Sequence, residues 1–90
     1  MTAREVPLGK TYITRNAESS LSPIDIHVAL SRHSKGDWGI VDDDDAKAND
    51  RAFENGDRLL SIFRSEAGQR FYVITEWDRS VTTVLLPEDY

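Results

Sequence analysis

The stretch RLLSIFRSEAGQRFYVITEWDRSVTTVLLP, residues 58–87, decides the fold. It contains three runs rich in aliphatic, aromatic and β-branched residues, at 58–65, 69–76 and 80–87, and each run has the length of a strand. EAG separates the first two runs and WDR separates the last two, and short polar connections of this kind are typical of hairpins. The sequence therefore predicts a three-stranded antiparallel meander that ends at Pro87.

One strand and one helix are expected near the start of the chain. Residues 8–14, LGKTYIT, alternate as a short strand, and the small polar residues 15–22 predict a loop or a single helical turn. Ser22 is a good N-cap residue, and Pro23 suits the first position of a helix. Apolar residues then recur at helical spacing, so the first helix should run to about Ser34.

The second helix is expected to begin inside GDWGIVDDDDAKAND, residues 36–50. A run of four aspartates suits the N-terminus of a helix, where the backbone N–H groups and the helix dipole favour negative charge. Gly56 is placed to end this helix as a left-handed C-cap. The four aspartates are Asp42, Asp43, Asp44 and Asp45.

The complete pattern predicts one α+β domain over residues 1–90. The element order is β-α-α-β-β-β, which predicts an antiparallel sheet with two helices packed on one face. The run 58–65 carries apolar residues on both of its faces. One layer of helices covers only one face, so we expect a second cover, such as a homodimer contact.

The composition excludes several classes of protein. The chain has no cysteine, so disulfides, thiolate metal sites and cysteine nucleophiles are excluded. No apolar run is long enough to cross a membrane, and the N-terminal residues lack the apolar core of a signal peptide. We expect a cytoplasmic protein with no membrane association.

The negative charge lies in one block. The net charge is −5, and residues 36–57 alone carry eight acidic and two basic side chains. Nucleic-acid affinity depends on clustered Lys and Arg, so this balance argues against nucleic acid as the main partner. Two interpretations remain for the block, a solvated helix or a surface that binds a protein partner with a basic surface.

The aspartate run does not have the spacing of a calcium loop. Such a loop needs glycine at its sixth position and glutamate at its twelfth. Counted from Asp42, these positions are Lys47 and Phe53, and counted from Asp37 they are Asp42 and Ala48.

The two histidines do not form a metal site either. His27 and His33 are six residues apart, which places them on different faces of a helix. The sequence predicts no metal site and no cofactor.

Two short loops carry the remaining candidates for chemistry. GDWG, residues 36–39, presents an aspartate and a tryptophan between two glycines, and TEWDRS, residues 75–80, forms a polar hairpin tip. Each loop is either a structural turn or part of a binding surface. The candidate residues in the two loops are Asp37, Trp38, Trp77, Asp78, Arg79 and Ser80.

Two alternative functions remain open, and only the first of them uses these residues. If the two loops met, Asp37, Asp78, Arg79 and Ser80 would form the site of a small hydrolase or metal-dependent enzyme. No glycines of a nucleophile elbow flank Ser80, and no phosphate-binding glycine loop is present. The second alternative is a nucleic-acid-binding module that uses the strand arginines. These arginines are Arg58, Arg64 and Arg70.

Residues 33–90 resemble a family of small bacterial proteins found on plasmids and other mobile elements. Some members carry a type I restriction methylation-subunit label, but ninety residues without a glycine-rich cofactor loop do not suit a methyltransferase domain. The chain departs from the family in its first 30 residues and at Trp77, where a small residue is common. The matching motifs are GDWG at 36–39, Asn49, GDRLLS at 56–61 and ITEWDRSVTTVLLPEDY at 74–90.

The expected function is therefore that of a non-enzymatic interaction protein of a mobile element. The resemblance implies the context, whereas the acidic helix and the two tryptophan-bearing loops indicate how a partner would be bound.

Overall fold

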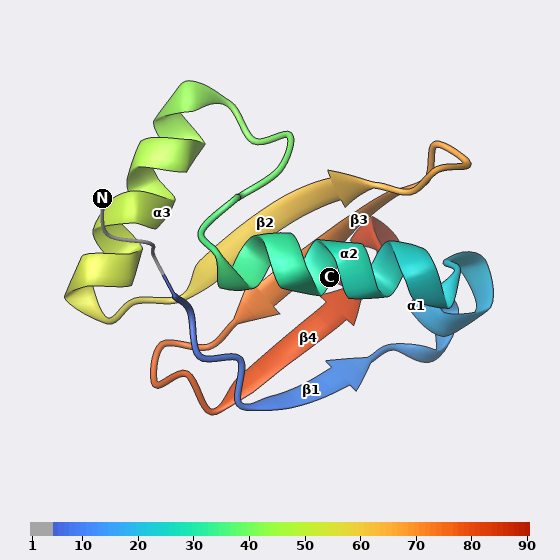
Figure 1. Ribbon diagram of the computed structural model, residues 1–90, viewed down its shortest axis with the longest axis horizontal. Coiled ribbons are helices and arrows are strands. Elements are labelled where there is room, and N and C mark those ends of the chain that lie inside the picture. Colours follow the sequence, from blue (N-terminus) through green and yellow to red (C-terminus); the bar gives the residue numbers. More distant parts are fainter. Residues whose placement is uncertain (1–4) are drawn as a thin grey trace.

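The computed structural model describes residues 5–90 and has the predicted α+β fold (Figure 1). Within these residues, no helix is both long enough and apolar enough to span a membrane. A short additional helix precedes the first long one. The elements are β1 Lys10–Ile13, α1 Arg15–Ser20, α2 Pro23–Ser34, α3 Asp43–Asn55, β2 Leu59–Arg64, β3 Arg70–Thr75, β4 Val81–Leu85 and the 3-10 helix η1 Pro87–Asp89.

The sheet is mixed, and the prediction of a purely antiparallel sheet was wrong. Its strand order is β1-β4-β3-β2. The meander of β2, β3 and β4 is antiparallel as predicted, but β1 pairs with β4 in parallel. The residue pattern of β1 contains no information about its direction. The direction is set by the three helices after β1, which return the chain to the end of the sheet where it started, so that β1, β2 and β4 run the same way.

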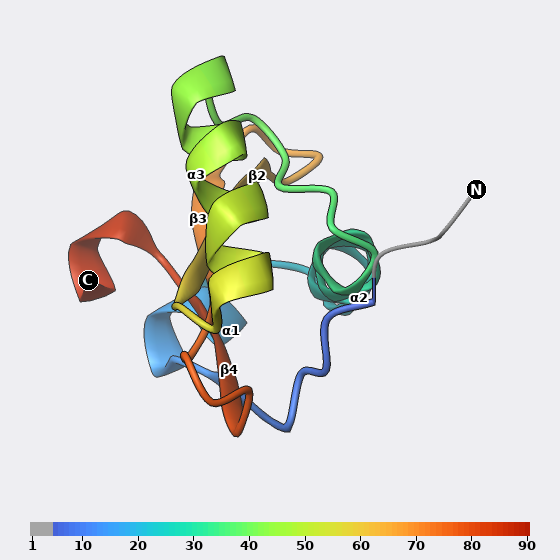
Figure 2. The ribbon, with the colours of Figure 1, turned by 90° about the vertical axis from the view of Figure 1, so that its left-hand side faces the viewer.

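Helix α2 covers one face of the sheet (Figure 2). It begins as predicted, with Pro23 in its first turn and the Ser22 hydroxyl accepting a hydrogen bond of 3.1 Å from the Asp25 N–H. Its inner residues join side chains of β3 and β4 in the main core. The buried residues of this core are Ala17, Leu21, Ile26, Ala29, Phe63, Phe71, Val73, Val84 and Leu86.

The chain's own C-terminus covers part of the opposite face (Figure 2). The ring of Tyr90 meets that of Tyr72 edge-on, with centroids 5.9 Å apart, and the Arg58 guanidinium lies 5.5 Å from the Tyr90 centroid. Ile74 and Leu85 are buried on this face. This face thus has an intramolecular cover over part of its apolar surface.

Helix α3 lies beside the β2 edge of the sheet (Figures 1 and 2). This position differs from the prediction, which placed α3 on the same face of the sheet as α2. Its ends are as predicted, because Asp42 caps its N-terminus and Gly56 ends it with a φ of 74°. The side chains between α3 and the sheet form a second core around Val6, Trp38 and Leu59.

The β2 edge is closed by two different segments. Gly39 forms an isolated parallel bridge with Ile62, whose N–H donates to the Trp38 carbonyl and whose carbonyl accepts from the Ile40 N–H. One step along the edge, the Asn49 amide of α3 donates to the Leu60 carbonyl at 2.7 Å and accepts from the Leu60 N–H at 3.1 Å. These contacts satisfy backbone groups that an edge strand would otherwise expose.

The Asn49 amide therefore has a measurable structural role. We expect Asn49→Ala to lower the free energy of unfolding by about 2 kcal/mol, because it leaves the part-buried N–H and C=O of Leu60 without the amide that they bond. Asn55→Ala, at an exposed position of the same helix, is the matched control and should change stability by less than about 0.5 kcal/mol. Urea unfolding of both variants measures the difference, and equal effects would contradict this role.

Candidate functional site

The GDWG segment is held by side chains of α2 and α3. The Asp37 carboxylate accepts hydrogen bonds from Arg32 Nε at 2.7 Å and from the Gly39 N–H at 3.0 Å. The hydrogen bond from Arg32 lowers the pKa of Asp37. Trp38 is only 5% exposed, and its indole N–H donates to Asp50 Oδ1 at 2.9 Å. Trp38 is thus packed into the domain.

The EWDRS turn is organised around Asp78. Its carboxylate accepts hydrogen bonds from the Ser80 hydroxyl at 2.6 Å and from the Ser80 N–H at 3.1 Å. The bond from the hydroxyl is the main cause of the lowered pKa of Asp78. Trp77 differs from Trp38 because it is 66% exposed. The turn therefore engages its own serine and leaves its tryptophan at the surface.

Arg79 joins this turn to the C-terminus of α3. Its guanidinium donates to the carbonyls of Asp57 at 2.6 Å, Ala52 at 3.2 Å and Glu76 at 3.1 Å. These contacts place a cation where the last carbonyls of α3 point, and that is the stabilising sign for the helix dipole. The backbone of Arg79 has a φ of 62°, which suits a tight turn. Arg79 thus positions Trp77 at the C-terminal end of α3.

The structure does not bring the two loops into one site. The GDWG segment runs along the middle of β2, whereas the EWDRS turn lies beyond the end of α3 (Figure 1). Within residues 5–90, no hydrogen bond or ion pair links Asp37 to the candidate residues of the EWDRS turn. The same part of the chain contains no group of three or more acidic or histidine side chains with the geometry of a metal site. The geometry offers no support for a hydrolase at these residues.

The aspartate run forms the N-terminus of α3, at the opposite end of this helix from Arg79. Asp42 acts as the cap, and its carboxylate accepts from the Asp45 N–H at 2.8 Å. All four carboxylates are exposed. The side chains of Asp43, Asp44 and Asp45 make no hydrogen bond or ion pair with any residue in the range 5–90. These three carboxylates face solvent at one end of the domain.

The strand arginines do not form a basic patch. Arg64 and Arg70 lie opposite each other at the β2–β3 turn, and both are exposed. Arg58, at the other end of β2, donates to the Tyr90 hydroxyl at 2.9 Å and stacks on its ring. Six residues of strand, roughly 20 Å, separate Arg58 from the other two. The interpretation as a nucleic-acid-binding module gains no support from this arrangement.

A chain of buried hydrogen bonds centred on His33 was not predicted from the sequence. The His33 ring is fully buried, with Nδ1 2.6 Å from Ser61 Oγ and Nε2 2.8 Å from Thr75 Oγ1. Thr75 Oγ1 lies 2.7 Å from Thr82 Oγ1, and the Thr82 hydroxyl donates to the Leu8 carbonyl. This series of hydrogen bonds thus links α2, three strands and the segment before β1. Hydroxyl residues at inward positions of otherwise apolar strands were the available signal.

The direction of these hydrogen bonds fixes the tautomer of His33. The Thr82 proton goes to a carbonyl, so Thr75 must donate to Thr82 and must in turn accept from His33 Nε2–H. Nδ1 then accepts from the Ser61 hydroxyl. His33 and Ser61 resemble the serine–histidine couple of an enzyme, but both residues are fully buried and neither can reach a substrate. We therefore assign it a structural role.

The buried His33 makes stability depend on pH. The pKa of His33 is lowered from 6.5 to about 4. Burial of the ring is the main cause of this shift, and the charge of Arg79 is a second cause. The unfolded chain therefore binds a proton between these values that the folded chain does not bind. We expect full stability above pH 6.5 and a loss of about 3 kcal/mol as the pH falls to about 4. Urea unfolding across this range measures the loss, and a flat profile would contradict it.

The chain matches no family model, no curated protein and no solved structure. The resemblance to plasmid and mobile-element proteins therefore remains a prediction from the motifs in residues 33–90.

Proposed function

We propose that this protein is a non-enzymatic, cytoplasmic interaction domain that binds a protein partner with a basic surface. The N-terminal turn of α3 supplies the negative charge of the contact, and Trp77 supplies an aromatic anchor. The observation that carries the proposal is a contrast between two groups of candidate residues. Asp37, Trp38 and Ser80 are engaged within the domain, whereas Trp77 and the aspartates that follow the cap are exposed.

The three exposed carboxylates that follow the cap are available to attract a basic partner, because they form no hydrogen bond or ion pair within residues 5–90. A single cap is enough to start a helix, and Asp42 supplies it. The remaining aspartates, Asp43 to Asp45, concentrate charge on one turn, in a block of the chain with six more acidic than basic residues. Such a cluster attracts a basic surface and raises its association rate, and salt screens the effect.

The exposed side chain of Trp77 favours a protein, rather than another kind of molecule, as the partner. Tryptophan is enriched among the residues that contribute most to protein interfaces, and this one is 66% exposed. The bonds from Arg79 hold its turn at the C-terminal end of α3. The aspartates lie at the other end of this 13-residue helix, roughly 20 Å away. A partner that contacts both features must extend along the whole of α3.

The motif resemblance supports a mobile element as the context. The motifs in residues 36–39, 56–61 and 74–90 are similar to those of proteins carried on plasmids. In such a context, the partner is a protein of the host or of the element itself. The absence of cysteine suits a reducing compartment, which supports the cytoplasm as the location.

Affinity capture with three baits tests the proposal. The first bait is the wild-type chain, and the second is Asp43→Asn/Asp44→Asn/Asp45→Asn, which keeps the Asp42 cap. The third is a matched control that removes the same charge from exposed glutamates elsewhere, Glu18→Gln/Glu66→Gln/Glu88→Gln. Each bait is exposed to lysate of the native host at low and at high salt, and bound proteins are identified by mass spectrometry.

We expect the wild-type and control baits to recover the same protein at low salt. The aspartate variant should fail to recover it, and high salt should release it from all baits. Addition of Trp77→Ala to the control bait should weaken its recovery of this protein. Recovery by the aspartate variant equal to that by wild type would contradict the proposal, as would the absence of any protein that both the wild-type and the control bait recover and the aspartate variant does not.

A further inference from the structure

The two edges of the sheet differ in how they are covered. The β2 edge is closed by Asn49 and by the bridge at Gly39. The β1 edge is open, because no described element lies beyond it in Figure 1. All four residues of β1 are exposed, and Tyr12 and Ile13 are 53% and 40% exposed. β1 contains no proline, the residue that often protects a free edge from pairing.

We propose that two copies of this chain associate through β1, which pairs antiparallel with β1 of the partner across a twofold axis at Tyr12. The result is one continuous sheet of eight strands. This inference uses the edge opposite to α3 and does not depend on the proposed function.

The backbone of β1 allows this pairing in one register. The N–H groups of Lys10 and Thr14 donate to carbonyls of Ser80 and Val84, so the even-numbered residues face β4. Because N–H and C=O directions alternate along a strand, Thr11 and Ile13 present their backbone groups outward. A twofold axis at Tyr12 places Thr11 opposite the partner's Ile13, which gives two pairs of reciprocal hydrogen bonds.

The ends of the strand exclude other registers of comparable size. Gly9, before β1, has a φ of 63° and leaves the extended conformation. Thr14, after β1, caps α1 with its hydroxyl. A shift of the axis from Tyr12 to Thr11 or Ile13 would pair one outward residue with a segment that is not extended. Only the axis at Tyr12 pairs both outward residues with strand residues.

Charges match across this register. Lys10 lies opposite the partner's Thr14, and the Thr14 hydroxyl donates to Asp89 at 2.6 Å. Asn16 donates to the same carboxylate at 2.7 Å. The bond from Thr14 is the main cause of a lowered pKa of Asp89, so this group is ionised at neutral pH. Each Lys10 therefore comes within reach of the partner's Asp89, and the twofold axis gives two such ion pairs.

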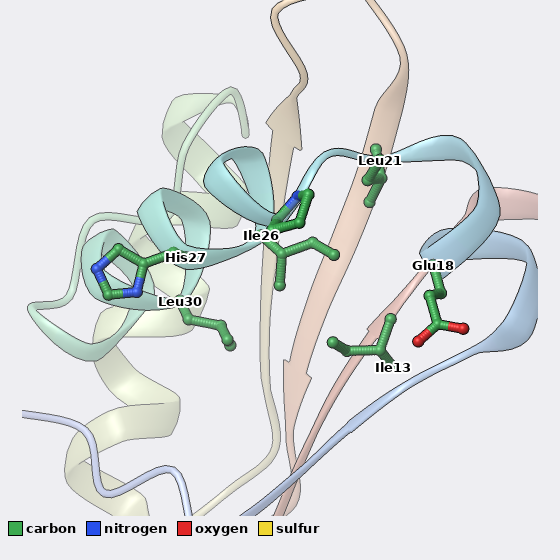
Figure 3. Close-up of a pocket in the computed structure, with 7 residues that line it drawn as sticks. Ile13, Glu18, Leu21, Ile26, His27 and Leu30 are labelled. Atoms are coloured by element: carbon green, nitrogen blue, oxygen red, sulfur yellow. The ribbon is translucent and has the colours of Figure 1, made fainter.

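An apolar groove beside β1 adds contact area on the face covered by α2. Ile13 lies across a hollow of about 380 Å³ from Ile26 and Leu30 of α2 (Figure 3). In the proposed register, the partner's Thr11 lies directly opposite Ile13. The two grooves then adjoin each other across the twofold axis, and the exposed side of Ile13 is covered. On the other face, the two Tyr12 rings form a cross-strand aromatic pair.

The charge distribution favours a second copy as the occupant of this edge. Each chain carries a net charge of −5, and residues 36–57, which include α3 at the β2 edge, carry eight of the 16 acidic side chains and only two basic ones. Pairing through β1 places the two acidic helices at the far ends of the joined sheet. The large separation of the two helices reduces the repulsion between their charges, and both acidic surfaces remain open to partners.

Sedimentation velocity of the full chain, from low micromolar to near-millimolar concentrations, tests the inference. We expect a reversible dimer. Thr11→Pro removes the outward N–H and leaves the N–H groups that bond β4 in place, so the dimer dissociation constant should rise by about tenfold or more while the circular dichroism spectrum is unchanged.

A charge reversal gives a second test that does not alter the backbone. Lys10→Glu brings two carboxylates together at each ion pair, and we expect it to weaken the dimer about tenfold. Lys35→Glu makes the same charge change at an exposed residue after α2 and should leave the dimer unchanged. A monomer at all concentrations would overturn the inference. A dimer that resists Thr11→Pro, or equal effects of the two charge reversals, would also overturn it.

Discussion

Replacement of Gly39 by alanine should lower the free energy of unfolding by about 3–5 kcal/mol. A Cβ atom at this position would lie 1.9 Å from the carbonyl oxygen of Ile62, which belongs to the backbone of β2. Gly39 also has a φ of 80°, a conformation that costs an L-residue about 1–2 kcal/mol. The bridge between residue 39 and β2 would have to open, and the Trp38 carbonyl would lose the Ile62 N–H.

Gly68→Ala is the matched control for this change. Gly68 also has a positive φ, of 93°, but nothing lies within 4 Å of an added Cβ. Its substitution carries the conformational cost alone, about 1–2 kcal/mol. Chemical unfolding of both variants by urea separates the two contributions. If Gly39→Ala costs no more than Gly68→Ala, the segment 37–40 is not anchored to β2 as described.

Replacement of His33 by alanine is expected to cost about 3–5 kcal/mol as well. The change removes a fully buried ring and leaves a cavity. It also leaves the hydroxyls of Ser61 and Thr75 without their partner in a part of the core that water does not reach. The buried hydrogen-bond chain would lose its central member, and such chains are costly when only partly satisfied.

His27→Ala provides the comparison on the same helix, because His27 is exposed. We expect a change of less than about 0.5 kcal/mol for this variant. Urea unfolding at pH 7.5 gives both values. In His33→Ala, the loss of stability between pH 6.5 and about pH 4 should also become smaller. A pH profile identical to that of the wild-type chain would show that another group causes the loss.

The features that sequence predicted correctly depend on neighbours along the chain. Ser22 caps α2, Asp42 caps α3 and Gly56 ends α3, and each of these roles involves residues within one or two helical turns. The meander was also predicted correctly, because its hairpins join strands that follow one another in the sequence. Short-range hydrogen bonds and alternation of apolar residues are visible in a single sequence.

The features that sequence did not predict depend on contacts between distant segments. The direction of β1 depends on 45 residues of helix and loop between Ile13 and Leu59. Trp38 packs between α3 and β2, and Arg79 donates to the carbonyl of Ala52, which lies 27 residues away in the sequence. Residue type alone does not distinguish a buried tryptophan from the exposed Trp77. His33 likewise bonds to partners that are distant in the sequence, Ser61 and Thr75.

The salt dependence of partner binding tests the central claim most directly. The dissociation constant of the captured partner is measured over a series of salt concentrations for the wild-type chain, for the variant with asparagine at positions 43, 44 and 45, and for the glutamate control. We expect the aspartate variant to bind about tenfold more weakly at low salt and to depend less on salt, with the control within about twofold of wild type. Equal affinity and equal salt dependence of the aspartate variant and the wild-type chain would contradict the claim.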